Sequence, residues 1–330
     1  MVESVEYKTK KKYDKILIIA DVHGLIEELK EFLHLMKERH GDTIAYCIQL
    51  GDFWKGRNVI QGEKTFSFWK DQSIFDEFPY PIYGIKGNED INIPGDWWKN
   101  GMLSLIPDKK EFLLDDLRII SVYYFEETKK FYREMGIKKF ERVPPPPDFE
   151  RYKYFPLFDF IPTDDRVPDE ILTNDSEIDF IISHVPPYGL LDKTRDSTTH
   201  KEIRYTGNKF LRLLIDKRRP KVVFFGHNHF ANYRMFGDML VVSCDKFVRK
   251  IPAWADDDFL DKYPKKKKYK SKRKNRWSRR NYPKKTKEKN LFSYCLIIKH
   301  GTNYIIEMYR RDKLTFRYDV RDEKILLSKL

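Results

Sequence analysis

Five short apolar runs constrain the fold of this 330-residue chain more than any other feature of its sequence. Each run is rich in Ile, Val, Leu or Phe and leads directly into a polar residue that is able to bind a metal. The runs occupy residues 16–20, 44–50, 82–86, 178–183 and 222–225. Continuous apolar runs of this length are typical of strands that are buried on both faces of a sheet.

Helical patterns lie between several of these runs. Apolar residues recur with helical spacing in 25–39, and residues 65–77 and 207–218 are predicted as further helices, the last ended by Pro220. Strands that alternate with helices indicate an α/β layered fold. In such folds ligands bind beyond the carboxyl ends of the strands, so we expect the five polar endings to lie at that edge.

Other segments have the pattern of antiparallel strands. Two pairs flank short turns and predict hairpins, at 111–115 with 117–125 and at 291–299 with 303–310. Residues 239–247 and 313–320 are predicted to add strands. We therefore predict a single domain over 1–330 that combines parallel and antiparallel strands.

Composition excludes several classes of protein. With 41% hydrophobic and 15% aromatic residues the chain is globular rather than disordered. No run approaches the roughly 20 apolar residues of a membrane helix, and the first residues lack the apolar core of a signal peptide. The three widely spaced cysteines, Cys47, Cys244 and Cys295, favour reduced thiols in the core. These features predict a cytoplasmic protein, or a nuclear one if the organism is eukaryotic.

The polar residues at the strand ends form five motifs. A single Asp-x-His or His-x-His motif more often belongs to a solvated loop or a structural turn than to a metal site. Five such motifs in order, all at strand ends, predict a pair of divalent ions. The seven candidate ligands are Asp21, His23, Asp52, Asn88, His184, His227 and His229. Their mixture of nitrogen and oxygen donors favours Mn²⁺, with Fe, Zn²⁺ or Ni²⁺ as alternatives, over Mg²⁺ or Ca²⁺.

The series DVH, GD, GN, H and GHNH resembles the calcineurin-like metallophosphoesterase superfamily. The resemblance implies a four-layer αββα sandwich and a phosphoesterase in which hydroxide held between two ions attacks phosphorus. It also implies which residues hold each ion. The first ion would be bound by Asp21, His23, Asp52 and His229, and the second by Asp52, Asn88, His184 and His227, with Asp52 bridging both.

One motif departs from the commonest form of the superfamily. Many members have His after the motif's Asn, where it protonates the leaving oxygen, but this chain has Glu89 there, followed by Asp90. The GN-x-D form resembles the smaller phosphodiesterase branch and the scaffold subunit of retromer. Because a carboxylic acid donates a proton near neutrality only if its pKa is raised, we predict diesters with good leaving groups as substrates, or another acid. The alternatives are a catalytically weak binding scaffold and a phosphomonoesterase that acts on nucleotides or phosphoproteins.

A second, weaker resemblance is to RNA lariat debranching enzymes. It rests on GDFWKGRN at 51–58 and on Asp-Lys-Phe at 245–247, whereas the GNED motif does not fit that family. Arg57 either binds phosphate oxygens in a bidentate manner or is a solvated loop residue. The predicted catalytic residues are thus Asp52, Asn88, Glu89 and Arg57.

Two segments do not follow the strand and helix pattern. Residues 126–177 contain four consecutive prolines and are predicted as an insertion or cap-like segment. Residues 264–290 are predicted as a basic, flexible arm, because 265–289 hold fifteen Lys or Arg against one Glu while the rest of the chain is nearly neutral. Interleaved aromatic residues favour nucleic-acid binding, with targeting, protein contact or solubility as alternatives. The predicted substrate contacts are Arg57, Lys265, Lys266, Arg273, Arg276 and Arg279.

Overall fold

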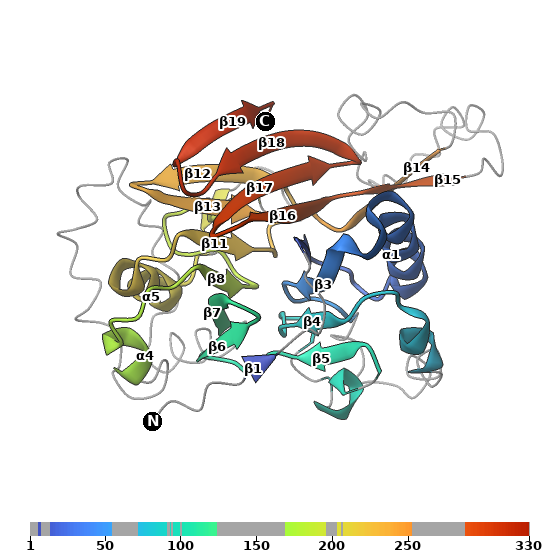
Figure 1. Ribbon diagram of the computed structural model, residues 1–330, viewed down its shortest axis with the longest axis horizontal. Helices are drawn as coiled ribbons and strands as arrows, with labels where there is room; N and C mark the ends of the chain where they lie inside the picture. The colour runs from blue at the N-terminus through green and yellow to red at the C-terminus, as the bar shows by residue number, and fades with distance from the viewer. Residues whose placement is uncertain are drawn as a thin grey trace, which may run out of the picture.

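Two mixed sheets, packed face to face, form the body of the protein (Figure 1). The computed structural model describes residues 6–7, 14–54, 72–90, 93, 95–99, 101–123, 169–195, 203–205, 207–252 and 288–329. Arg57 and most of the two unusual segments, residues 126–168 and 264–287, lie outside these ranges. The described ends of those segments are regular, since residues 169–177 include helix α4 and residues 288–290 begin a strand.

The first sheet has eight strands in the order β19-β18-β17-β16-β2-β3-β4-β5. Its parallel part contains the first three apolar runs, and its antiparallel part comes from the C-terminal region. The bounds are β2 (Lys15–Ile19), β3 (Ile44–Gln49), β4 (Ile82–Gly84), β5 (Leu103–Leu105), β16 (Tyr294–His300), β17 (Asn303–Arg310), β18 (Lys313–Asp319) and β19 (Lys324–Ser328).

The second sheet has seven strands in the order β1-β6-β7-β8-β11-β13-β12. The other two apolar runs are its neighbouring parallel strands β8 and β11. The bounds are β1 (Glu6–Tyr7), β6 (Lys110–Leu114), β7 (Leu117–Val122), β8 (Phe180–Ser183), β11 (Val222–Phe225), β12 (Asn232–Phe236) and β13 (Met239–Ser243). Two separate pairs complete the strands: β9 (Lys193–Arg195) with β10 (Ile203–Tyr205), and β14 (Val248–Pro252) with β15 (Glu288–Phe292).

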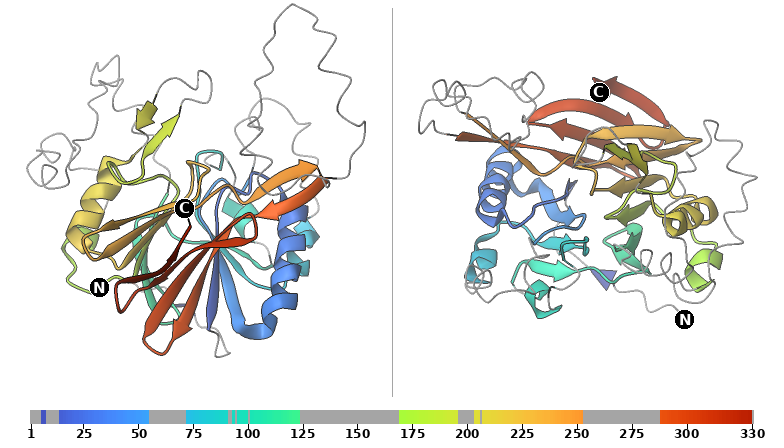
Figure 2. Two further views of the ribbon diagram at one scale, coloured as in Figure 1. Left: turned by 90° about the horizontal axis from the view of Figure 1, so that it is seen from above. Right: turned by 180° about the vertical axis from the view of Figure 1, so that it is seen from behind.

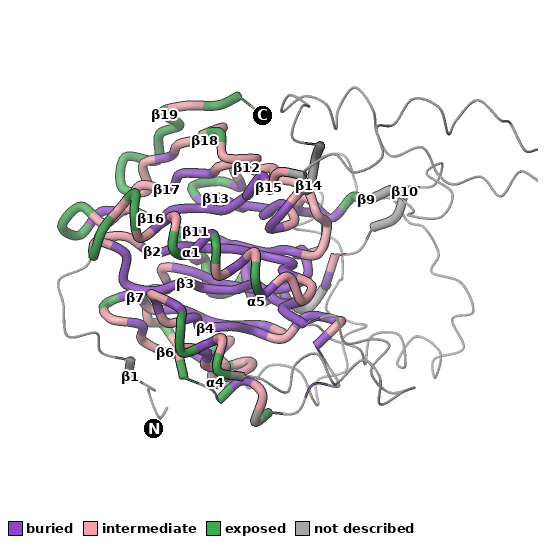
Figure 3. Tube along the Cα trace, turned by 90° about the vertical axis from the view of Figure 1, so that its right-hand side faces the viewer, coloured by how far each residue is buried: buried purple, intermediate pink, exposed green. Residues whose placement is uncertain are grey.

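Alternation of side chains along the central strands produces the layers. In β2, Ile18 faces the core between the sheets while Leu17 packs toward α1 (Ile26–His40). In β11, Phe224 faces the same central core while Val223 packs against α5 (Lys209–Arg218). Both faces of these strands are therefore buried, which is why their sequences are continuously apolar (Figure 3). The predicted αββα sandwich is confirmed.

The helices follow the predicted spacing with small shifts at their ends. Helix α1 buries Leu29, Phe32 and Met36 on one face and ends before Gly41, whose positive φ closes its last turn. The short helix α4 (Asp169–Thr173) packs beside α5. The described residues also include 3₁₀ turns at η1 (Gly41–Thr43), η4 (Gln72–Glu77) and η5 (Gly95–Trp98). The predicted helix 65–77 is thus a 3₁₀ turn in its described part, Gln72–Glu77.

The predicted hairpin of 291–299 with 303–310 is confirmed as β16 with β17, but its first strand, 291–299, is divided between two elements. At Ser293 the chain leaves the small β14–β15 pair and enters β16 of the eight-stranded sheet. The Ser293 N–H donates to the carbonyl of Phe247, which lies just before β14, and not to a partner within the large sheet. The predicted strand 239–247 likewise ends early, at Ser243. The β14–β15 pair lies beside α1, where Phe292 contacts Phe32 (Figure 2).

Candidate metal centre

The seven predicted ligands follow five strands that end on the same side of the sandwich. Asp21 and His23 follow β2, Asp52 follows β3, and Asn88 follows β4 in the eight-stranded sheet; His184 follows β8, and His227 and His229 follow β11 in the seven-stranded sheet. The two sheets are joined at this point, because the backbone N–H of His227 donates to the two carboxylate oxygens of Asp21 at 3.2 and 3.0 Å. The structure thus brings all seven residues together.

The backbone at these positions has an unusual conformation. Among the described residues, five of the seven predicted ligands have positive φ values: Asp21 at 55°, His23 at 51°, Asp52 at 53°, His227 at 66° and His229 at 58°. Positive φ is uncommon for residues other than glycine, and such strain concentrates at functional sites. Strands β2, β3 and β11 are therefore each followed by a sharp turn at their predicted ligands.

The first half of the site is formed by Asp21, His23 and His229. The Nε2 atom of His229 lies 3.2 Å from Oδ1 of Asp21 and 3.1 Å from Nε2 of His23. The His23 Nε2 lies 3.9 Å from the same Asp21 oxygen. One ligand atom from each of the three residues therefore fits around a single ion.

The second half is formed around His184, which is fully buried. Its Nε2 lies 3.4 Å from Oδ1 of Asp52, 3.0 Å from Oδ1 of Asn88 and 3.1 Å from Nδ1 of His227. Asp21, Asp52 and His184 form a second group whose ligand atoms fit around one ion.

The hydrogen bonds of His184 test whether this half fits a cation. Its Nδ1 lies 2.9 Å from the carbonyl oxygen of Leu50, so this nitrogen carries the proton and donates it. The other ring nitrogen, Nε2, faces the Asn88 oxygen and is available to a cation. The amide orientation of Asn88 is supported by its Nδ2, which donates to Oε1 of Glu89 at 3.3 Å. A backbone hydrogen bond that fixes the ring in this way is typical of a histidine that holds a metal.

The charges at the site also require compensation. Burial raises the pKa of Asp52, and the nearby carboxylates of Asp21 and Glu89 act in the same direction. Burial acts to raise the pKa of Asp21 as well, but the hydrogen bond and charge of His229, with the other nearby imidazoles, outweigh it and lower this pKa. Burial lowers the pKa of His23 to about 4, so this ring is neutral and able to ligate at neutral pH.

Close backbone approaches explain the glycines that precede two ligands. A Cβ atom on Gly51 would lie 2.6 Å from Nδ1 of His184. One on Gly87 would collide with the backbone nitrogen and the carboxylate of Asp52. The GD and GN motifs therefore contain glycine because the loops and the ligands pack against one another without space for a side chain.

Asp90 binds the backbone of the two loops that carry Asp52 and Asn88, and it was not predicted as a functional residue. Its buried carboxylate accepts hydrogen bonds from the backbone N–H groups of Phe53 at 3.0 Å, Trp54 at 2.8 Å and Gly87 at 2.9 Å. Burial, together with the charge of Asp52, raises the pKa of Asp90 to about 7. The GN-x-D spacing was the available signal, since the acid lies two residues after a ligand.

Two further residues near the site were also missed as functional candidates. Arg249 of β14 donates from Nη2 to the carbonyl oxygen of His229 at 2.9 Å and to Oδ1 of Asp245 at 3.0 Å. Lys246 lines a pocket beside His23 together with Glu89, the predicted acid. The Asp-Lys pair at 245–246 was noted in the sequence, but no local pattern places it beside residues more than 200 positions earlier. The predicted contacts Arg57, Lys265, Lys266, Arg273, Arg276 and Arg279 lie outside the described residues.

The fold and the paired Asp/His groups define a metal-dependent hydrolase that acts on phosphate esters. Residues 14–231, well over half of the chain, match the profile of the calcineurin-like phosphoesterase family. The chain belongs to this family, whose members typically bind two divalent metals. No curated protein sequence matches the chain significantly.

Solved structures share the fold at low sequence identity. A dimetal phosphatase from Danio rerio superposes with a TM-score of 0.51 at 10% identity, covering 94% of this chain and 99% of its own. GAP50, described as the anchor in the inner membrane complex of Plasmodium, gives a TM-score of 0.48 at 11% identity, with 97% of this chain and 91% of its own covered.

None of the helices in the described ranges has the length and apolar character that a membrane span needs.

Proposed function

We propose that this protein is a phosphodiesterase that uses two divalent ions, Mn²⁺ above all, held by the seven residues at the strand ends. The observation that carries the proposal is the convergence of imidazole nitrogens with carboxylate and amide oxygens around His184, at 3.0 to 3.4 Å. Nitrogen and oxygen ligand atoms that converge at these distances fit a shared cation.

The positions of the carboxylate oxygens support the assignment of ligands to the two ions. The Oδ1 atom of Asp52 lies 3.4 Å from Nε2 of His184, and its Oδ2 atom lies 3.9 Å from Nδ1 of His23. A carboxylate with one oxygen on each side fits a bridging position. We therefore assign Asp21, His23, Asp52 and His229 to one ion and Asp52, Asn88, His184 and His227 to the other. Two such ions, when bound, supply Lewis acidity and an activated water nucleophile.

Glu89 supports a preference for diesters over monoesters. Its backbone N–H donates to Oδ1 of Asp52 at 2.7 Å, and its side chain lines the pocket beside His23. A phosphodiester carries one negative charge at phosphorus and a phosphomonoester near neutrality carries nearly two, so a fixed carboxylate at this position disfavours the monoester. Asn88 donates to Oε1 of Glu89 at 3.3 Å, and Glu89, once it has taken up a proton, is the proposed acid for the leaving group.

The basic segment supports nucleic acid as the substrate. Residues 253–287 connect β14 to β15, and β14 carries Arg249, which binds the carbonyl of His229. The position of this positive segment in the chain, directly after a strand that contacts the loop of His229, supports a role in substrate capture. The proposed phosphate contacts are Arg57, Lys265, Lys266, Arg273, Arg276 and Arg279.

The buried thiols of Cys47, Cys244 and Cys295 form no disulfide, which is consistent with the proposal of a cytoplasmic protein.

The test combines metal content with turnover. The purified protein, loaded with Mn²⁺, is assayed for bound metal and for hydrolysis of bis(4-nitrophenyl) phosphate, 4-nitrophenyl phosphate, single-stranded RNA and single-stranded DNA. We expect about two ions per chain, faster hydrolysis of the diester than of the monoester, and at least a hundredfold loss of turnover in Asp52→Asn. A chain that binds no metal supports a binding scaffold, and faster hydrolysis of the monoester supports a phosphomonoesterase.

A further inference from the structure

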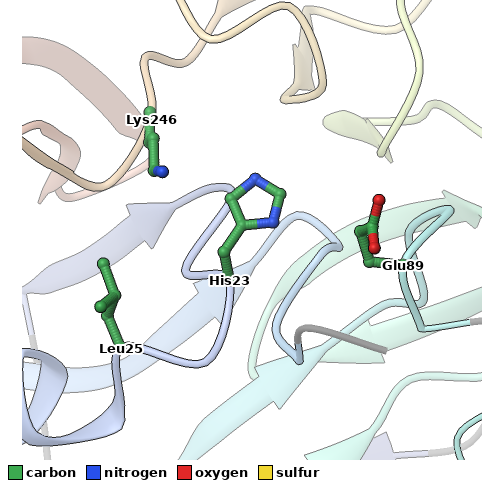
Figure 4. Close-up of a pocket in the computed structure, with 4 residues that line it drawn as sticks. All are labelled: His23, Leu25, Glu89 and Lys246. Atoms are coloured by element: carbon green, nitrogen blue, oxygen red, sulfur yellow. The ribbon is translucent and has the colours of Figure 1, made fainter. Parts of the chain in front are cut away.

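A pocket of about 320 Å³ opens beside the metal centre and has opposite charges at its two ends. His23, Leu25, Glu89 and Lys246 line it (Figure 4). Lys246 and Leu25 lie on one side of the His23 ring and Glu89 lies on the other. The carboxylate end belongs to the proposed acid, but the lysine end has no part in holding the metals.

The backbone on both sides of Lys246 is firmly anchored. Asp245 is buried, pairs with Arg249 at 3.0 Å and accepts the N–H of Lys246 at 2.8 Å. Phe247 is fully buried, and its N–H donates to the carbonyl of Ala20, directly before the first metal ligand. The half-buried Lys246 side chain therefore leaves a fixed point of the backbone.

The predicted metal ligands Asp21 and His184 lie deeper in the site than Lys246, so the lysine is separated from a phosphate that the metals would hold. Asp21 and His184 are fully buried, so a phosphate held by the metals lies at the base of the site. Leu25 is only partly buried and stands beside Lys246, so it offers an apolar contact between the base of the site and the ammonium group. A substrate that fills the pocket therefore presents a second group to Lys246, and the chemistry that matches an ammonium group there is an anion.

We propose that Lys246 binds a second phosphate group of the substrate, one that is attached to the alcohol lying on the Leu25 side of the scissile diester. This assignment rests on the proposed phosphodiesterase function and narrows its substrate class. The preferred substrate is a diester with a further phosphate on one substituent and a neutral, hydroxyl-bearing substituent beside Glu89, because that carboxylate repels an anion. The hydrolysis itself is unchanged: water is added and the leaving alcohol departs.

The test compares Lys246→Gln with Lys246→Arg and with Lys217→Gln, which removes the same charge from the exposed surface of α5. Substrates are a thymidine dinucleotide without a terminal phosphate, the same dinucleotide with a 5′- or a 3′-phosphate, and bis(4-nitrophenyl) phosphate. For one of the two terminal phosphates, the wild-type KM is expected to be about tenfold lower than for the unphosphorylated dinucleotide. Lys246→Gln removes this difference, Lys246→Arg retains most of it, and Lys217→Gln retains it fully.

Two further measurements separate this inference from the proposed function. Turnover of bis(4-nitrophenyl) phosphate, which has no second phosphate, is expected to fall less in Lys246→Gln than turnover of the terminally phosphorylated dinucleotide, and Lys217→Gln keeps both turnover and metal content within about twofold of wild type. Calorimetric binding of thymidine 3′,5′-bisphosphate against thymidine 5′-monophosphate reports on Lys246 without turnover. If wild type and Lys246→Gln bind the two probes with the same ratio of affinities, the second-phosphate site is wrong even when the diester is hydrolysed. If the metal-loaded wild type fails to hydrolyse any diester, the proposed function fails, while the calorimetric ratio still decides the role of Lys246.

Discussion

The carboxylate of Asp90 accepts the backbone N–H of Trp54 at 2.8 Å, which connects the loop that carries Asn88 to the loop that carries Asp52. With the hydrogen bonds from Phe53 and Gly87, this one side chain fixes three backbone donors at the base of the metal centre. Asp90 is not itself one of the seven predicted metal ligands. Its contribution is to hold Asp52 and Asn88 at the distance that a shared ion requires.

Replacing Asp90 by Asn is expected to weaken metal binding by roughly 10- to 100-fold. An amide has one accepting oxygen and one NH₂ group, so at least one of the three backbone N–H groups loses its acceptor. The matched control is Asp238→Asn in the exposed turn between β12 and β13. Titration with Mn²⁺, followed by the signal of free Mn²⁺, measures both variants, and equal affinities for the two would remove Asp90 from this role.

Replacing Gly87 by Ala is expected to disrupt the site more severely than any surface glycine change. The added Cβ would collide with the backbone nitrogen and carboxylate of Asp52. Gly95 provides the control, because a Cβ there meets no atom within 4 Å. We expect Gly87→Ala to lose about 1–3 kcal/mol of unfolding free energy and most of its metal affinity. Gly95→Ala should stay near wild type in thermal unfolding and in metal titration, and similar losses in both variants would contradict the packing argument.

The sequence predicted which residues meet at the strand ends because each candidate ligand is covalently next to a buried strand. A run such as 44–50 has to be a two-face-buried strand, and Asp52 then has to lie at its carboxyl end. The pairing between strands was not available in the same way. Strand β16 lies beside β2, nearly 280 residues away in the chain, and only the assembled sheet brings them together.

The missed features depend on contacts between distant segments. The run from Leu291 to Ile298 is interrupted only by Ser293 and Tyr294, yet the chain changes sheets at Ser293, whose N–H pairs with the carbonyl of Phe247. Local periodicity carries no information about such a change of partner. The positions of Lys246 and Arg249 beside the metal centre depend in the same way on how β14 leaves the sandwich, whereas the seven ligands needed only their own strands.

Replacing Arg249 by Gln is expected to weaken the half of the site that contains His229. The guanidinium donates to the His229 carbonyl and to the buried carboxylate of Asp245, so it fixes the loop and neutralises the acid together. After its removal Asp245 retains the contact with Arg310 at 3.8 Å. Arg234→Gln, on the exposed side of β12, is the control.

The expected result for Arg249→Gln is loss of one of the two bound ions at a metal concentration that saturates wild type. Metal analysis after gel filtration counts the ions, and the thermal unfolding temperature shows whether the fold remains. A variant that keeps both ions and loses only thermal stability would assign Arg249 to folding alone.

Removal of the metals is expected to lower the stability of the native protein. The site holds two buried carboxylates, Asp21 and Asp52, close to one another, and a cation that binds only the folded chain stabilises it by mass action. At a free Mn²⁺ concentration of 100 times the Kd, this contribution is about 2.7 kcal/mol. Thermal unfolding after chelation should therefore occur at a lower temperature and return to the original value when Mn²⁺ is restored.

His184→Asn makes the same measurement specific to the proposed site. The Nδ1 of His184 faces the carbonyl oxygen of Leu50, so Nε2 is the nitrogen that faces Asn88, Asp52 and His227. Asn removes that nitrogen lone pair, and most of the Mn²⁺-dependent shift should disappear. His300→Asn, at the exposed end of β16, should retain the full shift. A full shift in His184→Asn would mean that the stabilising ion binds elsewhere on the chain.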